Sequence, residues 1–244
     1  MTSGLQPPAS NLQPPRPPLV KICGVSDPKH ARLAAAYGAD FIGMVFAPSR
    51  RQVTLGQAKR IAQALGKGEQ CAPAKATTEA IEEALASRRP LLVGVFADQD
   101  ADTINAIAEE CGLDLVQLSG SEPWEVCGQL KRPVLKCMKV RQGQPARAVL
   151  AEIGEGALVL LDPYVEGAYG GAGVTLDWNV AAQVAARVPV MLAGGLSPDN
   201  VGQAVRTVRP WAVDVSSGVE TDGAKDVEKI RAFIQAAKEA APVE

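Results

Sequence analysis

The sequence predicts an α/β protein, a (β/α)8 barrel in a single domain, from two observations. Eight short apolar runs recur between residues 19 and 216, and most are continuously hydrophobic, as in parallel strands covered on their outer face. Alanine-rich segments with helical spacing separate them, and several begin with a capping residue or end with glycine. An open doubly wound sheet usually has fewer units or a dinucleotide-binding fingerprint, which we do not find. Eight alternating units over about 225 residues favour the closed barrel.

The elements follow one another in a regular order. The expected strands are residues 19–23, 40–46, 91–96, 114–118, 133–137, 157–161, 189–193 and 211–216. Helical patterns at 27–38 and 101–112 both end with glycine, a common helix stop. Further helical patterns cover 55–66, 197–208 and 224–240. Helices thus alternate with strands, as parallel pairing requires.

Two segments fall outside this alternation. Residues 1–18 hold six of the chain's 18 prolines and few large apolar side chains, a composition typical of a disordered, extended leader or linker. The barrel is therefore expected to span 19–244. Residues 66–90 are longer than a barrel loop requires, and their TTEAIEEALAS part predicts an extra helix. We interpret 66–90 as a peripheral insertion.

Composition and charge exclude several classes of function. A net charge of −2 gives no broad basic field for nucleic acid or an anionic membrane, and no apolar stretch is long enough to span a bilayer. These features predict a soluble, cytoplasmic protein without nucleic-acid or membrane partners. The chain has a single histidine, His30, and so lacks the histidines from which most zinc sites and hydrolytic triads are built. The five cysteines form no CxxC pair and are expected to be reduced thiols.

The ends of strands seven and eight indicate a phosphate site. Gly194-Gly195 and Ser216-Ser217-Gly218 place backbone N–H groups and hydroxyls at these two neighbouring strand ends, where such barrels commonly bind phosphate. A phosphorylated small-molecule substrate is therefore expected. The alternative is that these glycines only form tight turns.

Two reactive side chains follow other strands. Cys23 ends strand one and Asp162 ends strand six, so a thiol and a carboxyl face one another across the barrel mouth. They can serve as base and acid if the site shifts their pKa values. The alternatives are an inert core cysteine and a turn-forming aspartate. After strand two, one guanidinium of Arg50 and Arg51 can hold a carboxylate in bidentate fashion.

Together these motifs resemble the phosphoribosylanthranilate isomerase family of tryptophan biosynthesis, in a fungal-like version. The resemblance runs from Leu19 to about Phe233. The segments that carry it include KICG (21–24), GADFIGMVFAPSRRQV (38–53), LDLVQLSGSE (113–122), GGAGVTLDW (170–178), LAGGLSPDNV (192–201) and VDVSSGVETDGAKDVEKI (213–230). The combination of the KICG start with the VDVSSGVE finish makes the match specific.

The resemblance implies an Amadori rearrangement of N-(5-phosphoribosyl)anthranilate into the aminoketose 1-(2-carboxyphenylamino)-1-deoxyribulose 5-phosphate, without metal or organic cofactor. It makes Asp162 the general acid, Cys23 the general base and Arg51 the partner of the anthranilate carboxylate. It assigns substrate binding also to Gln117, Ser119 and Asp214. The implied phosphate-binding residues are Gly171, Gly173, Gly194, Gly195, Ser216, Ser217 and Gly218, with 170–173 as a mobile covering loop.

One departure from the family pattern lies in the expected pocket. The family usually has QLHG after strand four, where this chain has Ser119 in place of the histidine. A hydroxyl replaces the hydrogen bond of an imidazole but not its bulk or charge. We expect activity to survive, because Cys23 and Asp162 are both present.

Two other interpretations remain open at this point. A different phosphosugar isomerase, such as that of the histidine pathway, would be expected to have paired aspartates at the ends of strands one and five, where this chain has Cys23 and Lys136 or Cys137. A catalytically weakened barrel used for structure or binding is the second. Fungal members are often fused to other tryptophan-pathway domains, and the sequence leaves open whether this chain stands alone.

Overall fold

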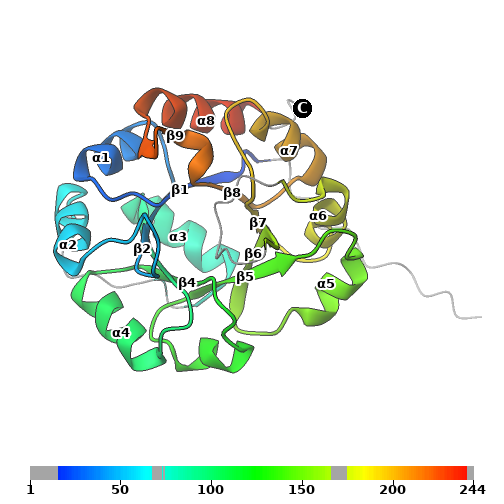
Figure 1. Ribbon diagram of the computed structural model, residues 1–244, viewed down its shortest axis with the longest axis horizontal. Helices are drawn as coiled ribbons and strands as arrows, with labels where there is room; N and C mark the ends of the chain where they lie inside the picture. Colours follow the sequence, from blue (N-terminus) through cyan, green and yellow to red (C-terminus); the bar gives the residue numbers. More distant parts are fainter. Residues whose placement is uncertain (1–15, 68–72, 74, 166–174, 241–244) are drawn as a thin grey trace, which may run out of the picture.

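The computed structural model describes residues 16–67, 73, 75–165 and 175–240. Eight parallel strands form a closed barrel, and the first strand pairs with both the second and the eighth. Helices surround the strands as an outer ring (Figure 1). The predicted (β/α)8 barrel is confirmed. The leader, apart from its last three residues, lies outside the described residues.

The elements fall close to the ranges expected from sequence. The barrel strands are β1 (Leu19–Cys23), β2 (Phe41–Val45), β3 (Leu91–Phe96), β4 (Leu115–Leu118), β5 (Val134–Val140), β6 (Ala157–Pro163), β7 (Val190–Leu192) and β8 (Ala212–Val215). The α-helices are α1 (Pro28–Ala36), α2 (Leu55–Ala64), α3 (Thr78–Arg88), α4 (Ala101–Glu110), α5 (Ala146–Glu152), α6 (Trp178–Ala185), α7 (Val201–Val208) and α8 (Val227–Glu239). The short elements are two 3-10 helices, η1 (Trp124–Gln129) and η2 (Ser217–Val219), and a hairpin of β9 (Glu220–Thr221) and β10 (Ala224–Lys225).

Side-chain caps explain where several helices begin. The carboxylate of Asp27 accepts a hydrogen bond from Lys29 N over 2.7 Å at the start of α1, and Asp100 caps α4 in the same way through Thr103 N. Thr54 and Gln57 form a reciprocal capping box at α2. Because these caps satisfy N–H groups that a helix start leaves unpaired, they fix the point at which each loop ends.

Strands β5 and β6 are longer than expected. Their parallel pairing continues through Lys139↔Asp162 and Val140↔Pro163, beyond the apolar runs that predicted them. Polar side chains near the site interrupted the hydrophobic pattern but not the backbone ladder. The extension places Lys139 and Asp162 side by side on neighbouring strands.

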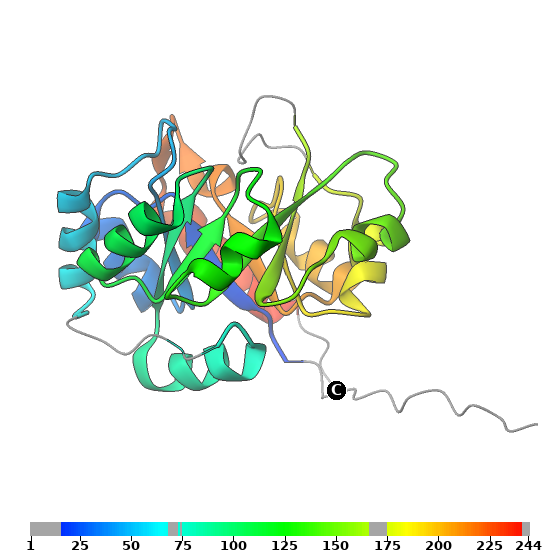
Figure 2. The same cartoon turned by 90° about the horizontal axis from the view of Figure 1, so that it is seen from below.

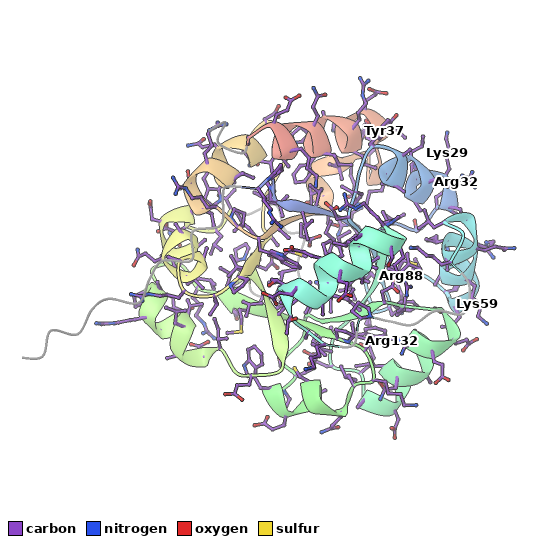
Figure 3. The ribbon with its side chains drawn as sticks, turned by 180° about the vertical axis from the view of Figure 1, so that it is seen from behind. Lys29, Arg32, Tyr37, Lys59, Arg88 and Arg132 are labelled. Carbon is purple, nitrogen blue, oxygen red and sulfur yellow. The ribbon has the colours of Figure 1, made fainter. Side chains whose placement is uncertain are left out.

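The helix predicted within 66–90 is α3, and it lies across the N-terminal opening of the barrel (Figures 2 and 3). Its Ile81 and Leu85 are buried and belong to the same apolar cluster as the barrel interior. Arg88, at its C-terminal end, pairs with Asp114 in front of β4, and Trp211 Nε1 donates to Glu82 over 3.0 Å. The helix therefore closes the end of the barrel opposite the site.

Packing is continuous around the rest of the barrel. The interior cluster between the strands includes Phe41, Leu115, Leu135, Leu158, Leu160 and Met191. A larger cluster lies between the strands and the outer helices. Over the described ranges, no helix has both the length and the apolar character needed to cross a bilayer. Cys111 and Cys127 are buried in the layer between the strands and the outer helices and are free thiols.

Candidate active site

A cavity of about 820 Å³, including the open space at its mouth, lies at the carboxyl ends of the strands. This is the end of the barrel opposite α3, shown at the top of Figure 2. It gathers expected site residues from six strand ends: Cys23, Arg51, Gln117, Ser119, Asp162, Gly194, Gly195, Asp214, Ser216 and Ser217. Gly171 and Gly173, in the expected covering loop, lie outside the described residues.

Cys23 lies at the end of β1 and lines the cavity, although its side chain is largely buried. Burial raises the pKa of its thiol, while the nearby ammonium groups of Lys21 and Lys225 lower it and Asp214 raises it. Cys23 therefore faces the cavity, whereas Cys111 and Cys127 lie in the outer layer.

Asp162 faces the same cavity from β6. Burial raises the pKa of its carboxyl group, and the negative charge of Asp214 acts in the same direction. Lys139 opposes this shift through an ion pair of 2.6 Å from Nζ to Oδ2. The net pKa is still raised, which favours the proton-carrying form that a general acid needs.

Arg51 and Arg50 have different surroundings. Arg51 lines the cavity, and its guanidinium donates to Glu220 twice, from Nε to Oε1 over 2.7 Å and from Nη2 to Oε2 over 3.0 Å. Arg50 is half exposed and contacts Glu220 and the carbonyl oxygen of Gly223. Lys225 Nζ also reaches Glu220 Oε1, over 2.8 Å. One carboxylate on the β9–β10 hairpin thus fixes the arginine that faces the cavity.

The turns after β7 and β8, where a phosphate site was expected, form one wall of the cavity. Gly194 and Gly195 adopt φ values of 84° and 58°, which only glycine adopts readily. The hydrogen bonds between described residues leave their N–H groups and that of Ser217 unused. Ser217 begins the 3-10 helix η2, so the helix start after β8 is this short turn, and α8 begins only after the hairpin.

Gly218 has a different surrounding from the other expected phosphate-binding residues. It is not among the cavity-lining residues, and a Cβ there would lie 1.9 Å from the carbonyl oxygen of Leu196. Its lack of a side chain allows the turn after β8 to pack directly against the loop after β7.

Gln117 and Ser119 form a buried pair on the cavity wall. Gln117 Nε2 donates to Ser119 Oγ over 2.9 Å, and Ser119 N donates to Phe96 O. Gln117 Oε1 is buried and has no partner among the described residues. A buried acceptor without a partner is costly, so this oxygen is suited to receive a donor from a bound molecule.

Sequence reasoning missed several polar residues around the site. Cys137 lines the cavity, and Lys21, Lys139, Glu220 and Lys225 contact residues that do. Lys21 in LVKIC and Lys139 in VLKCMKV each lie two positions from a cysteine, so alternation along the strand places lysine and cysteine on the same face. That spacing was the available signal. Glu220 had no such signal in the sequence, because only the folded hairpin brings it to Arg51.

Comparisons with known proteins agree with this architecture. The family model described as N-(5'phosphoribosyl)anthranilate (PRA) isomerase matches residues 65–236. An N-(5'-phosphoribosyl)anthranilate isomerase of Dehalococcoides mccartyi is 42% identical over 227 residues, covering 90% of this chain and 95% of that protein. The crystal structure of phosphoribosyl anthranilate isomerase from Thermotoga maritima is similar with a TM-score of 0.72 and 32% identity, covering 91% of this chain and 99% of that one.

A longer relative also matches. The multifunctional tryptophan biosynthesis protein of Phycomyces blakesleeanus is 40% identical over 249 residues, which cover 90% of this chain but 32% of that protein. The match therefore extends over nearly the whole chain in both bacterial and fungal proteins. The chain belongs to the N-(5'-phosphoribosyl)anthranilate isomerase family.

Proposed function

We propose that this chain converts N-(5-phosphoribosyl)anthranilate into 1-(2-carboxyphenylamino)-1-deoxyribulose 5-phosphate, an isomerisation step of tryptophan biosynthesis. The observation that carries the proposal is the shared cavity of Cys23 and Asp162, on β1 and β6, beside turns with unused backbone N–H groups. A base, an acid and an anion-binding wall are the parts that the rearrangement of a phosphorylated aminosugar requires.

Asp162 acts first, as the general acid. It donates its proton to the ribose ring oxygen as the C1–O bond breaks, and the anilino nitrogen lone pair forms the C1=N bond of a protonated imine. The raised pKa of Asp162, caused by burial, supports this role because more of the carboxyl group holds its proton at neutral pH.

Cys23 acts second, as the general base. Its thiolate removes the proton from C2, and that electron pair forms the C1=C2 bond as the imine nitrogen becomes a neutral amine. The resulting enolamine takes a proton at C1 and loses one from its C2 hydroxyl, which gives the ketone. Because burial raises the pKa of Cys23, the thiolate is the minor form and depends on nearby positive charge.

The remaining residues hold the two ends of the substrate. In this proposal the phosphate binds the N–H groups of Gly194, Gly195 and Ser217. The anthranilate carboxylate binds the edge of Arg51 formed by Nη1 and the second hydrogen of Nη2, which the ion pair with Glu220 leaves unused. Gln117 Oε1 accepts a hydrogen bond from the substrate.

We infer a cytoplasmic setting for this activity and association with other enzymes of the tryptophan pathway, as in the expected fungal-like version of the family. Support comes from the similarity to the multifunctional Phycomyces protein. The similarity to a bacterial protein of nearly the same span fits a separate chain equally well. Size-exclusion chromatography of the endogenous protein distinguishes a free chain from a fused or associated one.

Product identification tests the proposed reaction. The purified chain is incubated with N-(5-phosphoribosyl)anthranilate, the loss of substrate fluorescence is followed, and the product is examined by ¹³C NMR. We expect a ketone signal at C2 and a methylene at C1. Release of free anthranilate without ketone would indicate hydrolysis and would overturn the proposal.

A further inference from the structure

Lys21 is among the largest fully buried side chains of the described residues, and it carries an ammonium group next to the site. It is two residues before Cys23 on β1, so strand alternation directs both side chains to the same side. We propose that Lys21 is a positioning residue for the base: its buried ammonium group lies beside Cys23 and stabilises the negative charge of the thiolate. The effect of Lys21 on catalysis rests on the proposed function of Cys23 as the general base, whereas its effect on the thiol does not.

The contacts of Lys21 support the assignment. Its Nζ donates to Asp214 Oδ1 over 2.9 Å, and its positive charge lies close enough to Cys23 to act on the thiol. Strand β2 contributes Gly43 at this point, where a Cβ would lie 3.0 Å from Cys23 Sγ and 3.1 Å from Lys21 Nζ. Any side chain at position 43 would crowd the two groups, so glycine leaves the space in which they meet.

Packing alone does not account for a lysine at this position. The surrounding interior is filled by apolar residues such as Phe41, Leu91 and Met191. An apolar side chain of similar length would fill the layer without the cost of removing an ammonium group from water. Asp214 and Cys23 are the acidic groups that face it, and both raise the pKa of Lys21 against the effect of burial, so the ammonium form persists.

The charges around Cys23 have opposing effects. After burial, which raises the thiol pKa, the largest effect is the positive charge of Lys21, which lowers it. Asp214 on β8 raises it and Lys225 on β10 lowers it, while β2 contributes the uncharged Gly43. Replacing Lys21 with a neutral residue should therefore raise the pKa of Cys23, and replacing Asp214 should lower it.

Thiol alkylation measures this directly, without substrate. The full chain is treated with iodoacetamide between pH 6 and 10, and labelling of each cysteine is followed by peptide mass spectrometry. In Lys21→Met, the rate of Cys23 labelling at pH 8 should fall on the order of tenfold, because thiolate is the reacting form and one pKa unit changes its fraction about tenfold.

Cys137 provides the matched control within the same cavity. Burial raises its pKa to about 12, and the positive charge that lowers it most is that of Lys139 on the same strand. Lys21→Met should leave the labelling of Cys137 unchanged, whereas Lys139→Met should slow Cys137 and leave Cys23 unchanged. Equal slowing of both thiols in Lys21→Met would indicate a general change of the cavity and would overturn the proposal.

A second variant covers the case in which Lys21→Met does not fold. Asp214→Asn removes the competing charge, so Cys23 should be labelled faster than in the wild type at pH 8. Unchanged or slower labelling in that variant would contradict the proposal, as would an unchanged Cys23 profile in folded Lys21→Met. An inactive wild type with the expected labelling pattern would overturn the proposed reaction and leave the role of Lys21 intact.

Discussion

Lys139 Nζ donates to Asp162 Oδ2 over 2.6 Å, and the two residues are paired neighbours on β5 and β6. The proposed acid thus has a positive charge beside it, although an acid must be protonated to work. Burial and Asp214 raise the pKa of Asp162, whereas Lys139 and Lys21 lower it. Lys139 therefore limits how far the pKa rises.

The first prediction follows from this balance. Lys139→Met should raise the pKa of Asp162, so Asp162 stays protonated to higher pH and the alkaline limb of kcat/KM should move upward. The ratio of kcat/KM at pH 8 to that at pH 6 should increase. Lys131→Met, an exposed lysine paired with Glu109, is the control and should keep the wild-type profile. If the alkaline limb of kcat/KM does not move in Lys139→Met, the titration of Asp162 does not determine that limb.

Arg51 and Arg50 are expected to differ in their effects. Arg51→Lys keeps the charge but loses the planar donor edge, so KM should rise by about tenfold, consistent with the loss of a charged hydrogen bond. Arg50→Lys should stay within about twofold of wild type, because Arg50 does not line the cavity. Steady-state kinetics of both variants check the pair. A larger effect in Arg50→Lys than in Arg51→Lys would show that Arg50, and not Arg51, binds the anthranilate carboxylate.

Ser119 orients Gln117 in this structure, so its hydroxyl should matter for binding. Ser119→Ala leaves Gln117 Nε2 without its 2.9 Å partner and should lower kcat/KM by a few fold, on the order of one hydrogen bond of ~0.5 to 1.5 kcal/mol. In a Gln117→Ala background the same change should have almost no further effect. Additive losses in the double variant would show that Ser119 acts independently of Gln117.

The lowered pKa of Glu220 predicts that the stability of the fold depends on pH. Burial alone would raise its pKa, but hydrogen bonds from Arg51 and Lys225 lower it from 4.5 to about 2. A group whose pKa is lower in the folded state stabilises the fold above its ordinary pKa, and this contribution disappears as pH falls through the folded value. Urea unfolding should therefore show Glu220→Gln less stable than wild type at pH 6, with the gap shrinking between about pH 4.5 and 2. A gap that is constant with pH would contradict the assignment.

The fold was predictable because each strand carries its own local signal. Continuous apolar runs such as those of β3 and β7 appear in the sequence as they do in the barrel. The extension of β5 and β6 was not predictable, because Lys139 and Asp162 break the apolar pattern while the backbone pairing continues. The sequence predicted α3 as a helix, but its place across the barrel opening depends on tertiary contacts of Ile81 and Leu85.

The site was predictable where residues lie at strand ends and in small-residue turns. Cys23, Asp162, Gly194 and Gly195 follow from that rule, and the structure gathers them around one cavity. The supporting charges could not be predicted in the same way. Lys21 reaches Asp214 from a position 193 residues away in the chain, and Glu220 reaches Arg51 from 169 residues away, so only the closed barrel defines these pairs.

The most direct test of the account is the kcat of three proteins on N-(5-phosphoribosyl)anthranilate: wild type, Cys23→Ala and Asp162→Asn. Circular dichroism and a thermal melt show that each is folded. We expect wild type to convert the substrate and each variant to lose at least ~100-fold in kcat, the lower range of what a general acid or base supplies. No turnover by folded wild type, or near-normal kcat in either variant, would contradict it.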